Sequence, residues 1–264
     1  MKRTNAIVAA LCVLLLRPAT AAALEVIVGM PYGKHPIGHT AVRVRTFDAD
    51  REVIFDFGRY GKVWGYLRFH GEGVMRVWRG PQAVAHYLEK QRSFRDSIGY
   101  EIAVSPDEER RILAYYEGLL ATASWVKDYP LHRRYRLAAD YHGVTNQCTS
   151  MALEGLKKVL PRARWEAILG PRFNRGQGFD EATRTYFYQV QREKGLDETV
   201  VPLDVVDALE DARRRLPDVV VAVRRYDRRP AGPRRRPGAP RAAGRYGANI
   251  RAGSRNRARS IHRS

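Results

Sequence analysis

Residues 39–57 read HTAVRVRTFDADREVIFDF, with apolar and polar side chains alternating on both sides of the central FDAD. The alternation over 40–45 and 51–57 predicts two antiparallel strands joined by a tight turn. A turn centred on the Asp-Ala pair sets Val42 opposite Phe55 and places the valines and phenylalanines on one face. This stretch therefore predicts a β-hairpin with one face in the core.

The other face of the hairpin carries side chains of opposite charge that face each other across the strands. In the same register Arg45 lies opposite Glu52, and Asp56 lies diagonal to His39, within reach of a carboxylate–imidazole hydrogen bond. A slip of one residue would turn the core side chains outward and separate His39 from Asp56. The register that buries the apolar face therefore also predicts a His–Asp pair.

The rest of the pattern predicts an α+β fold, with strands clustered early and helices later. Ser105-Pro106-Asp107-Glu108 has the form of a helix start, with Ser as the cap and Glu three residues later. The other predicted strands span residues 24–29, 74–78, 98–104 and 219–223. The predicted helices span residues 81–94, a stretch that follows Ser105 and includes Leu120, and residues 146–160, 179–194 and 203–213.

The charge of the chain is concentrated at its ends. The 264 residues include 47 Lys and Arg against 28 Asp and Glu, and fourteen of the arginines lie in residues 224–264. Residues 24–223 are nearly neutral, so the net charge of +19 does not indicate a folded surface that reads a nucleic-acid sequence. We expect residues 224–264 to be a disordered Arg/Pro/Gly-rich tail that binds anionic polymers or membrane surfaces nonspecifically.

The first 23 residues have the layout of a secretory signal peptide. A basic start, Met1-Lys2-Arg3, precedes an apolar run over 6–16 and a stretch of small residues that ends at Ala23. The apolar run is too short to span a bilayer. We therefore expect an exported protein, periplasmic or secreted, with a signal peptide over 1–23 and a single domain over 24–223.

Cleavage after Ala23 would remove Cys12, one of the two cysteines, and leave Cys148 alone. An intramolecular disulfide and a four-cysteine zinc site are then excluded. Thr145 or Asn146 can cap a helix that begins here, which places Cys148 in its first turn, where free N–H groups and the helix dipole favour a thiolate. The alternative is a small, inert core residue.

A thiolate nucleophile needs a general base, and histidine is the usual one. Four of the seven histidines fall in loops, a surface helix or the tail, namely His70, His86, His132 and His262. Of His35, His39 and His142, His39 has a carboxylate partner in the predicted register. We predict that His39 is the base and that Asp56 orients it, with His142, six residues before the cysteine, as the reserve base.

Three motifs together resemble a known family. They are Gly38-His39-Thr40-Ala41-Val42-Arg43-Val44, Phe55-Asp56-Phe57-Gly58 and Thr145-Asn146-Gln147-Cys148-Thr149-Ser150. They are similar to motifs of the permuted papain-like cysteine hydrolases related to NlpC/P60, in which the His strand precedes the Cys helix. This group includes exported bacterial domains of unknown function, and its more distant relatives are lecithin:retinol acyltransferase-like enzymes and desumoylating isopeptidases. The resemblance covers roughly residues 24–160 and implies an antiparallel sheet packed against the helix that carries the cysteine.

The resemblance implies a Cys148–His39–Asp56 triad that hydrolyses an amide through a thioester, with no metal or cofactor. Many relatives have Asn directly before the cysteine, whereas here Gln147 stands there and Asn146 one step earlier, so both are oxyanion candidates beside the Cys148 backbone N–H.

In an exported protein the expected substrate is an amide bond of peptidoglycan stem peptides. Three alternatives remain open: acyl transfer or lipid deacylation at the same site, a catalytically silent envelope-binding module, and a secreted antibacterial toxin with the same chemistry.

Overall fold

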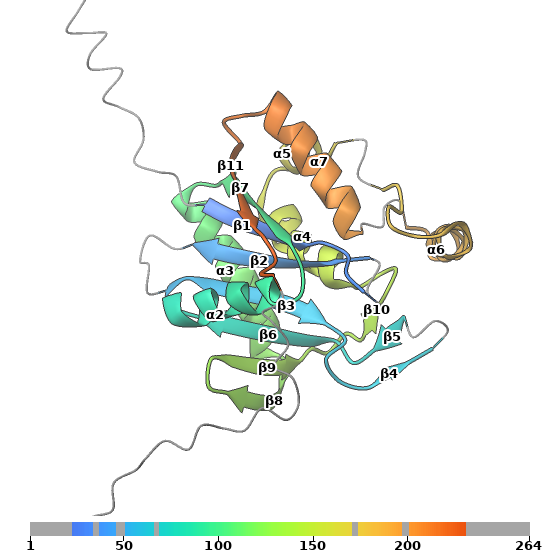
Figure 1. Ribbon diagram of the computed structural model, residues 1–264, viewed down its shortest axis with the longest axis horizontal. Coiled ribbons are helices and arrows are strands. Elements are labelled where there is room, and N and C mark those ends of the chain that lie inside the picture. Colours follow the sequence, from blue (N-terminus) through green and yellow to red (C-terminus); the bar gives the residue numbers. More distant parts are fainter. Residues whose placement is uncertain are drawn as a thin grey trace, which may run out of the picture. The chain divides into compact units, whose positions relative to one another are not determined.

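A computed structural model describes residues 23–33, 37–45, 51–65, 69–170, 174–196 and 201–230. These residues form an α+β structure with one large antiparallel sheet and six helices (Figure 1), which confirms the predicted class. The predicted signal peptide, apart from Ala23, lies outside the described residues, and so does the predicted tail beyond Pro230.

Eight strands form the large sheet, in the order β11-β7-β1-β2-β3-β6-β9-β8. Their bounds are β1 (Ala23–Gly29), β2 (His39–Arg45), β3 (Val53–Gly58), β6 (Val74–Arg79), β7 (Ser97–Ala103), β8 (Ser124–Tyr129), β9 (His132–Arg136) and β11 (Val220–Tyr226). A small second sheet has the order β10-β5-β4. Its strands are β4 (Val63–Trp64), β5 (His70–Gly71) and β10 (Tyr141–His142).

The hairpin of β2 and β3 has the predicted register, because Val42 pairs with Phe55 and Val44 with Val53. The predicted turn over 46–50 lies outside the described residues. The ion pairs on the second face differ from the prediction, since Glu52 pairs with Arg43 and not with Arg45.

Arg45 instead contacts Glu101 of β7. The reason is that β1 and β7 extend the sheet beyond β2 and bring further carboxylates to this face, which the hairpin sequence alone does not reveal.

Helices cover both faces of the sheet (Figure 1). Their bounds are α2 (Pro81–Arg92), α3 (Pro106–Ala121), α4 (Cys148–Val159), α5 (Arg162–Leu169), α6 (Glu181–Glu193) and α7 (Pro202–Arg215). The main core joins Val42, Phe55 and their neighbours to α3, α4, α5 and α7. A smaller core on the other face buries Ile54 and Trp78 against Tyr87 of α2. The hairpin is therefore buried on both faces, and Asp56, Arg43 and Glu52 on its charged face are largely enclosed.

The helix that follows Ser105 starts as predicted. The Ser105 hydroxyl accepts a hydrogen bond from the backbone N–H of Glu108, and the Glu108 carboxylate accepts one from the N–H of Ser105. This reciprocal cap satisfies two N–H groups that the first helical turn leaves without a partner. Tyr116 of the same helix stacks on Phe55, with 4.6 Å between ring centroids, and so joins α3 to the hairpin.

Several regions differ from the sequence prediction. Helix α5 and the small sheet of β4, β5 and β10 were not predicted, and both edges of the large sheet also differ. The hairpin of β8 and β9 was not predicted, because its strands lie at the sheet edge and carry charged side chains such as Arg133 without apolar alternation. At the other edge β11 extends to Tyr226, so the predicted tail boundary at Arg224 is too early. Arg224 pairs with Glu101 at 2.5 Å, and the Tyr226 hydroxyl donates to Glu25 at 2.6 Å, which binds these residues to the sheet.

Candidate active site

The hairpin brings His39 and Asp56 together on its second face. The Nε2 atom of His39 lies 2.6 Å from Oδ1 of Asp56, and the carboxyl group is fully buried. Both residues belong to neighbouring antiparallel strands, and a diagonal pair on one face is within reach of an imidazole and a short carboxylate. The predicted His–Asp contact is therefore present.

Two residues that the sequence did not single out hold the Asp56 carboxylate. Arg76 lies directly opposite Asp56 in the pairing of β3 with β6, and its guanidinium donates to Oδ2. The Tyr60 hydroxyl donates to Oδ1 at 2.8 Å and accepts from Arg76 at the same distance. Burial alone would raise the pKa of Asp56, but the charges of Arg76 and His39 and these hydrogen bonds hold it well below its usual range. Asp56 is thus a fixed anion beside the imidazole.

Cys148 is the first residue of α4, but its cap differs from the prediction. The N-cap is Gln147, not Thr145 or Asn146: its side-chain Oε1 accepts from the N–H of Thr149 at 2.8 Å. The Ser150 hydroxyl in turn accepts from the N–H of Gln147 at 2.9 Å. Glutamine replaces the shorter side chains that usually cap a helix, so residue type alone did not reveal the start.

A contact between β2 and α4 sets the cysteine beside the histidine. The hydroxyl of Thr40, the residue after His39, lies 2.9 Å from that of Thr149, the residue after Cys148, and both side chains are fully buried. Farther along α4, Gly155 admits the ring of Tyr116, because a Cβ there would lie 2.7 Å from it. The absence of a side chain at Gly155 thus lets α3 pack closely against α4.

The charges of Cys148 and His39 stabilise each other. Burial raises the pKa of the Cys148 thiol, but the charge of His39, a hydrogen bond to it and donors from Thr40 and Thr149 outweigh burial and lower it. Burial likewise lowers the pKa of His39, and the charges of Asp56 and Cys148 overcome that effect and raise it to about 9. Each group therefore favours the charged form of the other, thiolate for Cys148 and imidazolium for His39.

Tyr141 is a further residue at the thiol that sequence reasoning missed. Its side chain lines the cavity together with Cys148, and burial and the charge of Cys148 raise the pKa of its hydroxyl. Arg59 lies over the Tyr141 ring, 5.4 Å from its centroid. Tyr141 belongs to a two-residue strand, β10, which leaves no periodic pattern in the sequence.

The two oxyanion candidates have different surroundings. The Gln147 side chain is buried, and its Oε1 lies 3.5 Å from the Cys148 sulfur, so the cap directs a carbonyl oxygen and not an N–H to the thiol. Asn146 is half-buried, and its amide donates to the carbonyl of Asp140 at 2.8 Å. Its backbone pairs with that of His142, so Asn146 stabilises the turn before α4 instead of facing the sulfur.

The reserve base, His142, stabilises the same turn. Its Nδ1 accepts from the backbone N–H groups of Val144 and Thr145 at 3.1 and 3.2 Å, and its ring meets that of His70 edge-on, 4.4 Å between centroids. Burial and the charges of His70 and Lys194 lower the pKa of His142. The structure therefore brings His39, and not His142, into the electrostatic pair with Cys148. The third candidate, His35, lies outside the described residues.

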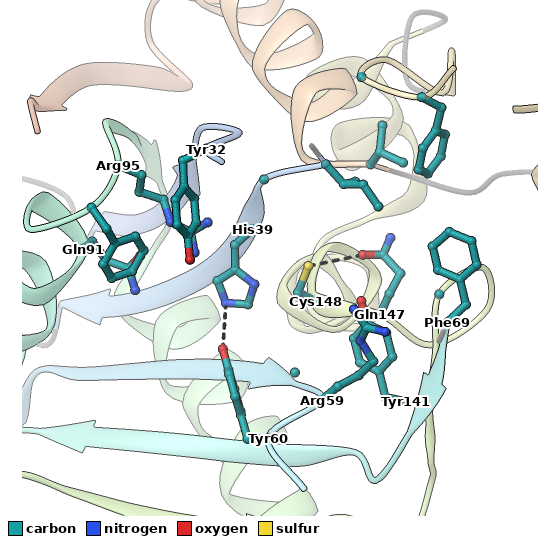
Figure 2. A pocket seen from close by; sticks show the side chains of 18 of the residues that line it. Tyr32, His39, Arg59, Tyr60, Phe69, Gln91, Arg95, Tyr141, Gln147 and Cys148 are labelled. Atoms are coloured by element: carbon teal, nitrogen blue, oxygen red, sulfur yellow. Dashed lines mark hydrogen bonds between the residues drawn. The ribbon is translucent and has the colours of Figure 1, made fainter. Parts of the chain in front are cut away.

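A cavity of about 760 Å³ opens onto the sulfur and the imidazole, and it is large enough for a small ligand. Figure 2 shows Cys148 near the centre, with His39 and Tyr60 to its left and Tyr141 and Phe69 to its right. The Nε2 contacts of His39 with Asp56 and Tyr60 leave its other ring nitrogen for the thiol. The site thus combines a thiol of lowered pKa, an imidazole of raised pKa and an open cavity beside both groups.

No protein-family model, no curated protein and no solved structure matches this chain. Within the described ranges, no three His, Cys, Asp or Glu side chains are grouped so that they could hold a metal ion. None of the helices in the described part of the chain has the length and apolar character needed to cross a membrane.

Proposed function

We propose that this protein is a cysteine hydrolase in which Cys148, His39 and Asp56 act as a triad. The observation that carries the proposal is the position of His39, which is hydrogen-bonded to a buried carboxylate and lines the same cavity as the Cys148 thiol, whose pKa its charge lowers. A nucleophile beside a base that a third group orients is the arrangement of nucleophilic acyl transfer. The buried Asp56 supports this role, because Arg76 and Tyr60 keep it ionised and immobile.

In the proposed mechanism the Cys148 thiolate attacks the substrate carbonyl carbon, and the carbonyl oxygen takes the electron pair as an oxyanion. The C–N bond then breaks, and His39 transfers its proton to the leaving amine. A water molecule, deprotonated by His39, attacks the thioester and releases the acid, which returns the site to its starting state. Burial of the site strengthens each of these electrostatic interactions.

The oxyanion requires hydrogen-bond donors beside the sulfur. The backbone N–H of Cys148 at the helix start is one, and we assign the Tyr141 hydroxyl as the second, because Tyr141 lines the cavity together with Cys148. A substrate oxygen that enters between them would accept from both groups. Gln147, the sequence candidate, would then act as the helix cap and not as a donor.

The proposed substrate is an amide bond of peptidoglycan stem peptides. Two features of the sequence support an envelope substrate: the signal-like first 23 residues and the basic segment beyond residue 223. A third support is the likeness of the Gly38-His39-Thr40 and Gln147-Cys148-Thr149 motifs to those of the permuted papain-like, NlpC/P60-related hydrolases. The order of elements, with the His strand before the Cys helix and an antiparallel sheet against that helix, agrees with such a permuted fold. The basic segment would keep the enzyme near an anionic envelope polymer.

Thiol alkylation combined with substrate hydrolysis tests the proposal. At pH 7 the mature chain should react with iodoacetamide at Cys148 faster than the urea-unfolded chain does, and it should release amine from synthetic stem peptides. Cys148→Ala should reduce hydrolysis to background with unchanged unfolding behaviour. Release of fatty acid from lipid, and not of amine, would assign the acyl-transfer branch instead. Labelling no faster than in the unfolded chain, together with full biological effect of Cys148→Ala, would refute catalysis.

A further inference from the structure

The cavity wall on the His39 side contains Arg95, whose guanidinium is packed against aromatic rings. Arg95 follows α2, and its guanidinium carbon lies 4.7 Å from the centroid of the Tyr32 ring and 4.9 Å from that of Phe94. Gly29 at the end of β1 makes room for it, since a Cβ there would lie 2.7 Å from the Arg95 Cδ. Figure 2 shows Arg95, Tyr32 and Gln91 together on this wall.

Polar atoms on this wall lack partners. The Nε and Nη1 atoms of Arg95 are buried without a hydrogen-bond acceptor, and Oε1 of Gln91 is buried without a donor. Gln91 is only 4% exposed and lines the same cavity. Buried polar groups are nearly always paired, because leaving one unpaired is costly. Two unpaired groups on one wall of a substrate-sized cavity indicate a ligand that supplies an acceptor for Arg95 and a donor for Gln91.

The charges around the cavity give the sign of that ligand. Its lining includes Arg59, Arg76, Lys90 and Arg95, whereas Asp180 is the one carboxylate among the described lining residues. Arg76 is neutralised by Asp56, and Asp180 caps α6 by accepting from the N–H of Thr183 at 2.7 Å. The cavity therefore has an excess of positive charge around a thiolate–imidazolium pair that is neutral overall, which favours an anionic ligand.

We propose that Arg95 and Gln91 form a subsite for a free carboxylate on an amide substrate: Arg95 binds the carboxylate, and the Gln91 carbonyl accepts from a nearby substrate N–H. This inference rests on the proposed function, and it narrows the substrate to an amide that carries a carboxylate near the scissile bond, as opposed to a neutral lipid ester. A guanidinium is suited to the task because its N–H groups match the two oxygens of a carboxylate. The stacked rings orient it before the ligand arrives, which reduces the entropic cost of binding.

The subsite can be tested with two thiol reagents that differ in one group, N-bromoacetylglycine and N-bromoacetylglycinamide. Each alkylates Cys148 as the sulfur–carbon bond forms and bromide leaves, and the first alone carries a carboxylate. The measured quantity is the alkylation rate constant with N-bromoacetylglycine divided by that with N-bromoacetylglycinamide. It is compared with the same ratio for free N-acetylcysteine, which gives the intrinsic reactivities of the two reagents. In the wild-type chain we expect the carboxylate to raise this ratio about tenfold, the size of one charge-assisted hydrogen-bonded contact.

Arg95→Gln should return the ratio to the N-acetylcysteine value, and because both reagents react with the same thiol, a change in Cys148 reactivity alone would leave the ratio unchanged. Arg95→Lys, which keeps the charge but loses the planar fork, should retain part of the effect. Arg133→Gln is the matched control, because Arg133 is an exposed arginine of β9 that lies outside the cavity lining and its loss changes the net charge equally.

The ratio does not depend on how reactive Cys148 is, so the two proposals fail separately. Slow alkylation by both reagents would contradict the proposed catalysis, while the ratio would still report the charge preference. A wild-type ratio equal to that of N-acetylcysteine, or a raised ratio that persists in Arg95→Gln, would overturn the carboxylate subsite.

Discussion

His39 and His142 are both partly buried imidazoles close to the start of α4, and the structure shifts their pKa values in opposite directions. Burial lowers the pKa of both residues. His39 nevertheless reaches about 9, because Asp56 and Cys148 surround it with negative charge. His142 stays below its ordinary value, because its charged neighbours are His70 and Lys194. The charged partners, and not burial or closeness in sequence to the cysteine, decide which histidine can hold a proton beside a thiolate.

The two residues also differ in what their ring nitrogens contact. His39 uses Nε2 for a side-chain acid, which fixes its orientation and leaves the other nitrogen for the cysteine. His142 uses Nδ1 as an acceptor for two backbone N–H groups, so it shapes the turn that leads into the helix. The imidazole of His39 is held by a side-chain carboxylate beside the cysteine, and that of His142 stabilises backbone structure.

Removing the imidazole of His39 should have the largest effect. His39→Gln should lower hydrolysis of a stem peptide by about 10³-fold, the contribution expected of a positioned acid–base group. It should also raise the pH at which Cys148 becomes reactive toward iodoacetamide, since the thiolate loses its cationic neighbour. The matched variant His142→Gln should keep both properties within about twofold. An equal loss of hydrolysis in the two variants would show that the structural contrast does not determine function.

The second effect concerns the pH range of activity. In the wild-type chain, hydrolysis should fall on the alkaline side as His39 loses its proton near pH 9. Asp56→Asn removes the main cause of that raised pKa and leaves burial, which lowers it, so the alkaline limit should move down by about one pH unit or more. Activity at pH 7 should fall at the same time. The measurement is hydrolysis rate against pH for both chains.

Asp56→Asn also leaves Arg76 buried without a counterion, which is expected to destabilise the fold by about 3 kcal/mol or more. The double variant Asp56→Asn with Arg76→Gln removes the charge from both partners and should recover part of that stability. It should not restore the alkaline limit, because no anion then faces His39. An alkaline limit that stays near pH 9 in the double variant would assign the wild-type limit to another group.

The parts of the site that were predictable lie in elements with a strong local pattern. The period-two alternation around residues 46–50 fixed the register that joins His39 to Asp56, and this register is confirmed. The position of Cys148 at a helix start followed from the polar residues before it, although Gln147 and not Thr145 or Asn146 proved to be the cap.

The unpredicted residues depend on pairing between distant segments. Arg76 faces Asp56 only because β6 pairs with β3 after a connection that contains β4 and β5, and Tyr141 reaches the cavity beside Cys148 from a two-residue strand. Arg95 depends on a glycine at the end of β1, far away in sequence. Each of these contacts is set by tertiary packing, which leaves no periodic signal along the chain.

His142 should affect stability and not catalysis. His142→Ala removes the acceptor of the Val144 and Thr145 N–H groups, so the free energy of unfolding should fall by about 1–2 kcal/mol while hydrolysis stays within twofold. Because its pKa is lowered from 6.5 in the folded chain, the unfolded chain binds a proton more readily, and wild-type stability should decrease as the pH falls below about 6.5.

Urea unfolding at pH 7.5 and pH 5.5 measures both effects. His142→Asn, whose side-chain oxygen can accept from the N–H groups that follow it, should recover much of the stability lost in His142→Ala. Neither variant carries the ionisable imidazole, so both should lose less stability between pH 7.5 and pH 5.5 than the wild-type chain. A wild-type pH dependence that persists unchanged in both variants would assign it to other groups. A large loss of hydrolysis in the stable Asn variant would return His142 to the list of candidate bases.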